Sequence, residues 1–235
     1  TGARALGVEE GAPEKAVLLN LNIETAAKEK KTIAADIILV CVGRRPNSNG
    51  MGLEKLGVRL DDGKNIVTDL HGMTNVPGVF AIGDVTGPPQ LAHRASRDGL
   101  IVADVIHGGK SCKDYKTVPW AVFSDPEIAS AGLGEQEAAM LGLKVCVGRF
   151  PFAALGKALA SNETDGFVKV LINELDESIV GVHIVGPEAS NMIAEATLAI
   201  EMGASAEDVT ATIHAHPTFP EAFPEAVEAA FFRAI

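Results

Sequence analysis

The sequence has no apolar stretch long enough to cross a bilayer, since a membrane helix needs roughly 18 consecutive apolar residues. Residues 1–4 do not begin the basic and then apolar pattern of a secretory leader. A surplus of basic residues is also missing, because 20 lysines and arginines oppose 31 aspartates and glutamates and leave a net charge of −11. We therefore expect a soluble, cytoplasmic protein that binds neither nucleic acid nor membranes.

Cysteine is scarce, and Cys41, Cys112 and Cys146 lie far apart in the sequence. Their spacing forms neither a Cys-x-x-Cys redox pair nor a zinc-binding pattern, and we predict no metal site. Isolated cysteines usually pack as small hydrophobic side chains, so buried reduced thiols are the simplest interpretation. Internal repeats and low-complexity segments are absent too, whereas 47% of the residues are hydrophobic, which is enough for a globular core.

The first part of the chain has an α/β pattern. Short apolar runs at 16–22 and 36–43 predict two strands joined by a turn, and the uniform apolarity of the second favours a fully buried strand. The run at 78–85 predicts another buried strand, closed by Gly83. Small or apolar residues then recur at helical spacing from 92 to 107. Strand, loop and helix in this order are the unit of a doubly wound sheet.

From about residue 117 the pattern is that of an α+β domain. We predict four strands there, the last two joined as a hairpin, and two helices. The strands are expected at 118–124, 144–150, 166–173 and 178–185, and the helices at 187–203 and 220–233. This change of pattern, together with a break rich in proline, asparagine and glycine at 45–50, divides the chain into residues 1–45, 46–115 and 116–235.

One candidate binding site lies where the predicted strand at 78–85 ends. Gly83 would let a bulky ligand approach the backbone, and the Asp84 carboxylate could accept hydrogen bonds from hydroxyl groups. The predicted helix starts just beyond, where free N–H groups and the helix dipole favour negative charge. The residues at this start are Gln90, Leu91, Ala92 and His93. The alternative is an ordinary turn at a strand end, for which a Gly-Asp pair is common.

A second candidate site is formed by His216 and Glu221. Histidine exchanges protons near neutral pH, and a carboxylate on its far ring nitrogen fixes the tautomer and raises its basicity. Pro217 is a candidate for a cis peptide bond, which would orient His216 sharply. The alternative is a helix start, because Thr218 and Glu221 have the spacing of a capping box and Pro220 suits a first turn. Glu221 could serve in both roles.

Taken together, these motifs resemble the C-terminal part of the pyridine nucleotide–disulfide oxidoreductases, a family of flavoenzymes. Three regions carry the resemblance: the end of the family's NAD domain, its second FAD-binding stretch and its interface domain. They are residues 35–47, then 78–85 with 91–95, then 122–132, 164–169 and 181–186. His214 precedes the His216-Pro217-Thr218 run, and this arrangement is similar to the one in the branch that oxidises dihydrolipoamide with NAD. The lack of cysteine after Cys146 disfavours the mercuric reductase branch.

The resemblance implies roles for the candidate residues. Asp84 would bind the ribityl chain of FAD, residues 90–93 would meet the edge of its isoalloxazine ring, and Gly43 would touch NAD. His216 would take a proton from a dithiol substrate, with Glu221 orienting its ring. In this family the histidine acts across a homodimer interface on the flavin of the partner subunit.

Several features of a complete family member are missing from this sequence, namely the Gly-rich fingerprints for FAD and for NAD and a Cys-x4-Cys redox pair. We therefore expect a fragment that is inactive alone and retains neither cofactor. Its parent would convert dihydrolipoamide and NAD to lipoamide and NADH and would associate with 2-oxo acid dehydrogenase complexes and their lipoyl domains. Asp98 replaces the family's usual glutamate, a change that we expect to be tolerated. The alternatives are another disulfide reductase, a soluble transhydrogenase, or a non-catalytic dimerisation module.

Overall fold

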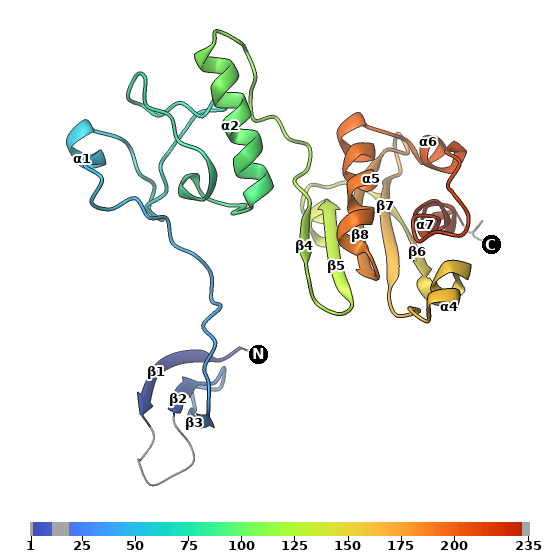
Figure 1. Ribbon diagram of the computed structural model, residues 1–235, viewed down its shortest axis with the longest axis horizontal. Coiled ribbons are helices and arrows are strands. Elements are labelled where there is room, and N and C mark those ends of the chain that lie inside the picture. Colours follow the sequence, from blue (N-terminus) through green and yellow to red (C-terminus); the bar gives the residue numbers. More distant parts are fainter. Residues whose placement is uncertain (1, 11–18, 232–235) are drawn as a thin grey trace. The chain divides into compact units, whose positions relative to one another are not determined.

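The computed structural model describes residues 2–10 and 19–231 (Figure 1). The chain divides into two compact units, Thr1–Arg45 and Pro46–Ile235. We describe each unit by itself. None of the described helices is both long and apolar enough to span a membrane.

The first unit holds an antiparallel sheet in the order β1 (Arg4–Glu10), β2 (Leu19–Glu24) and β3 (Lys30–Ala35). The predicted strand at 16–22 is therefore found from residue 19 onward, and its residues 16–18 lie outside the described part of the chain. A tight turn joins β2 to β3, with the N–H of Lys28 donating to the carbonyl of Thr25 over 2.9 Å.

The prediction of a buried strand at 36–43 is wrong for this structure. The chain continues past Ala35 without pairing to any described strand, and four apolar side chains of the run are 72–90% exposed. They are Ile37, Leu39, Val40 and Val42. A strand becomes buried only when neighbouring strands and a covering layer are present, and the described residues supply neither to this run.

The second unit begins with loops that carry α1 (Leu53–Leu56), the 3₁₀ helix η1 (Gly83–Thr86) and α2 (Ala92–Ile106). The helix α2 confirms the prediction for 92–107 and ends at the cap residue His107, followed by Gly108 at φ 92°. A small core of Val58, Ile66 and Ala81 packs beneath these loops.

The predicted strand at 78–85 does not form. Phe80 makes one isolated antiparallel bridge with Met73, and the chain then enters η1 at Gly83. The backbone N–H groups of this segment are satisfied by loops and by a side chain in place of a sheet. Gly83 has φ 72°, and a Cβ placed there would lie 3.0 Å from the Cβ of Ala95. Glycine is required here by both the backbone angle and the close approach to α2.

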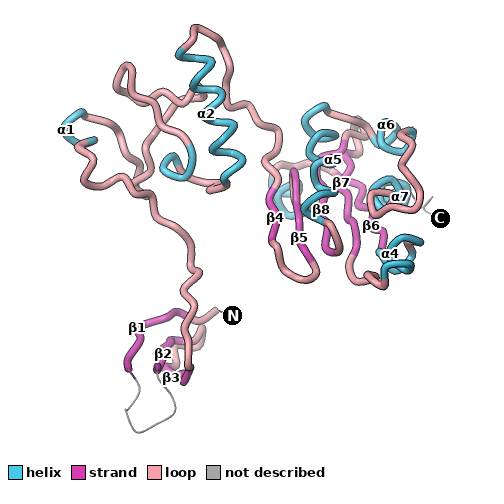
Figure 2. The backbone as a smooth tube through the Cα atoms, in the orientation of Figure 1, coloured by secondary structure: helices cyan, strands magenta, loops and turns pink. Residues whose placement is uncertain are grey.

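The rest of the second unit contains a five-stranded antiparallel sheet in the order β4-β5-β8-β7-β6 (Figure 2). Its strands are β4 (Trp120–Val122), β5 (Glu127–Gly132), β6 (Val145–Pro151), β7 (Phe167–Asn173) and β8 (Ile179–Gly186). The helix α5 (Ala189–Met202) packs on β5 and β8, while α7 (Ala222–Ala230) packs on β6 and β7. Fully buried side chains, including Phe152, Val168, Ile184 and Val227, form the core.

The four strands predicted for this region are confirmed, and so is the hairpin between β7 and β8. The helices α5 and α7 confirm the other two predictions, although residues 232–235 of the second lie outside the described residues. The sequence did not reveal β5, whose alanine, serine and glycine residues lack a strand signature. It also missed three helices of six residues each, which are too short to show a period. They are α3 (Glu135–Met140), α4 (Gly156–Ser161) and α6 (Ala206–Ala211).

Candidate functional site

The first candidate site lies between η1 and the start of α2. Asp84 is the second residue of η1, and its backbone carbonyl accepts hydrogen bonds from the N–H of Gly87 at 3.2 Å and from Gln90 Nε2 at 3.4 Å. These contacts fold the turn back toward the first residues of α2. Gly83, Asp84 and Gln90 are thus brought together as the sequence predicted.

The N-terminus of α2 presents its backbone to a ligand. The N-cap residue is Leu91, which offers no side-chain hydrogen bond to the first turn. The first N–H of the turn with an acceptor inside the helix is that of Ala95, which donates to the Leu91 carbonyl over 3.0 Å. The N–H groups of Ala92 and His93 therefore lie at the positive end of the helix, a place that suits partial negative charge.

The His93 side chain has a different role from its backbone. Its Nε2 lies 2.6 Å from the carbonyl oxygen of Pro119, so this nitrogen carries the hydrogen and donates it. The ring thereby attaches α2 to the segment that enters β4. A contact of His93 with a ligand at the helix start would come from its main chain.

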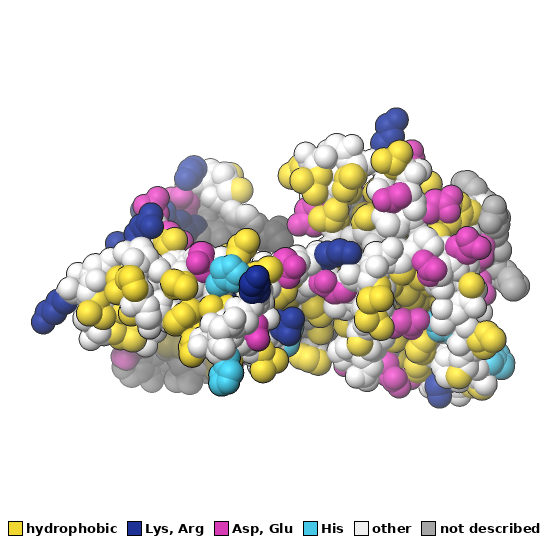
Figure 3. Space-filling model, turned by 90° about the horizontal axis from the view of Figure 1, so that it is seen from above, with side chains coloured by type: hydrophobic (Ala, Val, Ile, Leu, Met, Phe, Trp, Pro, Cys, Tyr) yellow, Lys and Arg dark blue, Asp and Glu magenta, His cyan; other side chains and the backbone are white. Residues whose placement is uncertain are grey.

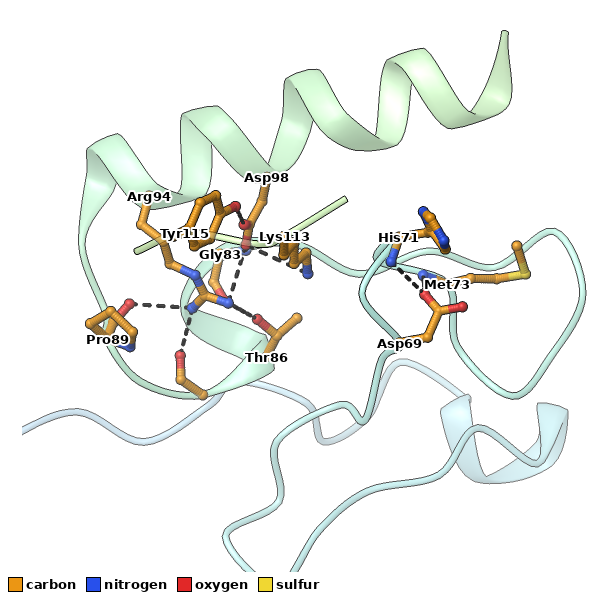
Figure 4. A network of polar contacts seen from close by, with 11 residues as sticks. Asp69, His71, Met73, Gly83, Thr86, Pro89, Arg94, Asp98, Lys113 and Tyr115 are labelled. Atoms are coloured by element: carbon orange, nitrogen blue, oxygen red, sulfur yellow. Dashed lines mark hydrogen bonds and ion pairs between the residues drawn. The ribbon is translucent and has the colours of Figure 1, made fainter. Parts of the chain in front are cut away.

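A buried polar cluster around Asp98 supports this site, and it was not predicted from the sequence (Figure 4). The Asp98 side chain is 0% exposed and lies 3.2 Å from Arg94 Nη2 and 3.7 Å from Lys113 Nζ. It also accepts hydrogen bonds from the Tyr115 hydroxyl at 2.5 Å and from the Gly83 N–H at 3.3 Å. Burial lowers the pKa of Lys113, although the charge of Asp98 acts in the opposite direction.

Arg94 extends the cluster to the turn that carries Asp84. Its guanidinium donates to the Gly87 carbonyl at 2.8 Å and to Thr86 Oγ1 at 2.9 Å. Asp98 and Arg94 together therefore hold both ends of η1 against α2. The one signal in the sequence was the spacing of four between these two residues, which places opposite charges on one face of a helix.

Tyr115 is the single tyrosine of the sequence and reports on this cluster. Burial raises its pKa, and the hydrogen bond and charge of Asp98 raise it further. Tyrosine ionises at about pH 10 in an unfolded chain. Below that pH the protonated Tyr115 hydroxyl therefore contributes its full stabilisation to the folded state, and this contribution is lost as pH rises through the pKa of Tyr115 in the folded chain. Spectrophotometric titration should show phenolate only at higher pH. Phenolate near pH 10 in a chain with folded α2 would contradict this expectation.

The second candidate site lies on the segment between α6 and α7. The His216-Pro217 peptide bond is cis, as predicted from the sequence. The His216 side chain is 77% exposed, and its Nδ1 lies 2.8 Å from Oε1 of Glu221. The predicted pair is thus formed.

Glu221 also takes part in the start of α7. Its Oε2 accepts the N–H of Thr218 at 2.6 Å, which is half of the predicted capping box. The other half is missing, because the Thr218 hydroxyl donates to the Ala215 carbonyl at 2.6 Å and Glu221 itself is the N-cap residue. The predicted His216–Glu221 pair and the predicted helix start are therefore both present, the second only in part, and the Glu221 carboxylate takes part in each.

The electrostatics of the pair favour an ionised glutamate. Burial by itself raises the pKa of Glu221, but the hydrogen bonds from Thr218 and His216 and the nearby charges of His216 and His214 outweigh it and lower the pKa. An ionised carboxylate accepts only, so His216 Nδ1 carries the hydrogen and the lone pair lies on Nε2. No hydrogen bond to Nε2 is found among the described residues. The arrangement can take up a proton at an exposed nitrogen.

Gly43, the predicted NAD contact, has φ 109° and lies in the exposed stretch after β3, with no heavy atom of the described residues within 4 Å of a Cβ built on it.

The cysteines do not form the buried set that we predicted. Cys41 is exposed, and Cys112 and Cys146 are half-buried. Cys41 belongs to the apolar run that finds no neighbouring strand, which explains its exposure. Among the described residues no group of three or more histidine, cysteine, aspartate or glutamate side chains is arranged to hold a metal ion.

Comparison with known proteins gives consistent matches along the chain. A model of the pyridine nucleotide-disulphide oxidoreductases matches residues 7–99, and a model of that family's dimerisation domain matches residues 118–227. The dihydrolipoyl dehydrogenase of Geobacillus stearothermophilus is 49% identical over 230 residues, which are 98% of this chain and 48% of that protein. The mitochondrial dihydrolipoyl dehydrogenase of Rattus norvegicus is 43% identical over 215 residues, which are 91% and 42% of the two chains.

Solved structures agree with these matches. The crystal structure of LpdA from Mycobacterium tuberculosis has a TM-score of 0.86 at 26% identity and covers 96% of this chain and 48% of that one. These findings confirm the predicted resemblance and the predicted fold class. The chain spans about half the length of the relatives that it matches.

Proposed function

Because the chain belongs to the pyridine nucleotide-disulphide oxidoreductase family, we propose that it is part of a flavoenzyme that oxidises dihydrolipoamide with NAD. The observation that carries this proposal is the His216–Glu221 pair, which leaves an exposed ring nitrogen ready to accept a proton. The activity belongs to a complete polypeptide that also holds the cofactor fingerprints and the redox cysteine pair. A dimerisation module without catalytic function would not need such a pair.

The chemistry that this chain supplies is proton transfer. His216 Nε2 takes the proton of a substrate thiol, and the resulting imidazolium is stabilised by the Glu221 carboxylate on Nδ1. The Thr218 N–H holds the same carboxylate in place. The thiolate that is formed is the reactive species in thiol–disulfide exchange. FAD, when bound, supplies the route for the two electrons from the dithiol to NAD.

The residues at the first candidate site fit one part of FAD. Asp84 on η1 would accept hydrogen bonds from the ribityl hydroxyls, beside Gly83. The uncapped start of α2, with Gln90, Leu91, Ala92 and His93, would face the flavin ring edge through its main chain. The family's use of FAD and NAD is consistent with these features. Gly43 is proposed as a contact of NAD.

In this proposal the chain supplies only some of the contacts that hold FAD, and the rest come from the remainder of the complete polypeptide. This division of contacts can be tested. The purified chain should carry no flavin and show no dihydrolipoamide oxidation, because contacts from Asp84 and α2 alone would not offset the entropy lost on binding. A complete polypeptide containing it should show both a flavin absorption band and NAD-dependent turnover. Flavin bound by the chain alone would contradict the proposed division of contacts, and a flavin-loaded complete enzyme without turnover would contradict the proposed substrate.

The family match at residues 118–227 is to a dimerisation domain, and we propose a homodimer. Apolar side chains on and just after β4, on α5 and on the segment that carries His216 are exposed, as expected for a surface that another subunit covers. They are Trp120, Val122, Phe123, Leu198, Met202 and Ile213. Figure 3 shows apolar side chains exposed among acidic ones on the face that it presents.

Light scattering on the purified chain should give the mass of a dimer at micromolar concentration, because interfaces between permanent subunits are largely apolar. Ile213 is 95% exposed and lies one residue after Thr212, the C-cap of α6, and three residues before His216. Ile213→Asp should shift the chain toward the monomer. The control Leu175→Asp, on the β7–β8 turn at 91% exposure, should leave the mass unchanged. A monomeric wild-type chain at this concentration would contradict the proposal.

A cytoplasmic location and association of the complete enzyme with 2-oxo acid dehydrogenase complexes through their lipoyl domains also belong to this proposal. The names of the relatives, dihydrolipoyl dehydrogenases, support the lipoyl substrate.

A further inference from the structure

The segment that carries His216 has little structure of its own. Residues 212–218 contain no helix or strand, and the His216 side chain is 77% exposed. On the side of α7, Glu221 holds this segment through Thr218 and His216. A base for proton transfer must also be fixed on its other side, since a small misplacement of a reacting group slows the reaction.

His214 supplies the attachment on that other side. Its side chain is 9% exposed, in contrast to that of His216, and lies against α5. Nε2 of His214 is 2.7 Å from Oε1 of Glu195, a residue in the middle of α5. Nδ1 lies 3.0 Å from the carbonyl oxygen of Thr212, at the end of α6. The imidazole thus joins three parts of the fold.

The partners of His214 define its protonation. A backbone carbonyl accepts hydrogen bonds only, and so does an ionised carboxylate. A ring that donates from both nitrogens, the imidazolium form, satisfies both acceptors. His214 and His216 thus differ although they stand two residues apart, because only one nitrogen of His216 has an acceptor.

We propose that Glu195 and His214 are positioning residues for the proton transfer, with the charged His214 holding the segment so that His216 Nε2 faces the substrate thiol. This inference rests on the proposed function. The ionisable groups near His214 are Glu195 from α5, which its Nε2 contacts, and Glu221 at the start of α7, whose pKa is lowered by both His214 and His216. The two carboxylates stabilise the imidazolium, whereas a protonated His216 opposes it.

The protonation state can be measured on the chain itself. Nitrogen-15 NMR of the imidazole rings at neutral pH should show both nitrogens of His214 protonated and at least one nitrogen of His216 deprotonated. In Glu195→Gln the His214 signal should move toward the neutral form, because the carboxylate is replaced by an amide of the same shape. A neutral His214 in the wild-type chain would overturn the proposal.

The positioning role must be tested in the complete, flavin-loaded enzyme. Glu195→Gln should lower kcat for dihydrolipoamide about tenfold while KM and flavin content stay unchanged, since the effect lies on the orientation of the base. In a His216→Gln background the same substitution should have no further effect, because it acts only through His216. Glu207→Gln, on the exposed face of α6, is the matched control and should leave kcat unchanged.

The outcomes separate this inference from the proposed function. Without turnover in the wild-type enzyme, both fail. Turnover that His216→Gln slows but Glu195→Gln leaves unchanged overturns the positioning role alone. An equal loss from Glu195→Gln in the wild-type and His216→Gln backgrounds also overturns it, because the glutamate would then act independently of the base.

Discussion

His216→Gln in the complete enzyme is expected to slow dihydrolipoamide oxidation about a hundredfold or more, the usual range for the loss of a positioned general base. Glutamine cannot take up a proton at the position of Nε2, although it can still donate a hydrogen bond to Glu221. Folding and flavin binding should be retained, because the His216 side chain is 77% exposed and packs against little. Turnover should be measured beside flavin absorption and thermal unfolding.

Glu221→Gln serves as the comparison and should slow turnover less than His216→Gln. The glutamate acts on the tautomer and charge of His216 and does not contact the thiol, so part of the positioning remains when it is neutral. If the pair were a helix cap only, both substitutions would change stability by about 1 kcal/mol and leave the rate per folded enzyme alone. Equal rates for the wild type and His216→Gln would therefore remove the catalytic assignment.

Asp98→Asn should produce the largest loss of stability. The substitution removes the carboxylate that pairs with the Arg94 and Lys113 side chains, which are 9% and 10% exposed. Removing one member of a buried ion pair typically costs about 3–5 kcal/mol, because the remaining charge stays buried without compensation. The loss should be local to α2 and η1, whose contacts depend on Asp98 and Arg94.

Hydrogen exchange of the α2 amide groups measures this effect locally, which avoids assuming that both units of the chain unfold together. The free energy of opening of α2 should fall in Asp98→Asn, while β7 and β8 should keep their protection. Asp62→Asn, on an exposed turn, is the matched control and should change the free energy of opening of α2 by less than about 0.5 kcal/mol. Unchanged exchange of α2 in Asp98→Asn would show that the cluster does not stabilise this region.

The sequence was sufficient where a structure depends on residues close together in the chain. The helix α2 follows from small and apolar residues at helical spacing, and the β7–β8 hairpin from two apolar runs around a short polar turn. The His216–Glu221 pair was also predictable, because the two residues stand five positions apart just before a predicted helix, within reach of a local side-chain hydrogen bond. The family resemblance followed from the order of these local motifs.

The tertiary structure decided everything that depends on distant partners. The apolar runs at 36–43 and 78–85 have strand composition, but a strand forms only against a neighbouring strand, and the described residues provide none for the first and a single bridge for the second. The contact between Glu195 and His214 joins residues 19 positions apart, and the Asp98 cluster gathers side chains from η1, α2 and the segment after it. Periodicity in a sequence describes one element at a time, whereas burial and ion pairing are set by which elements meet.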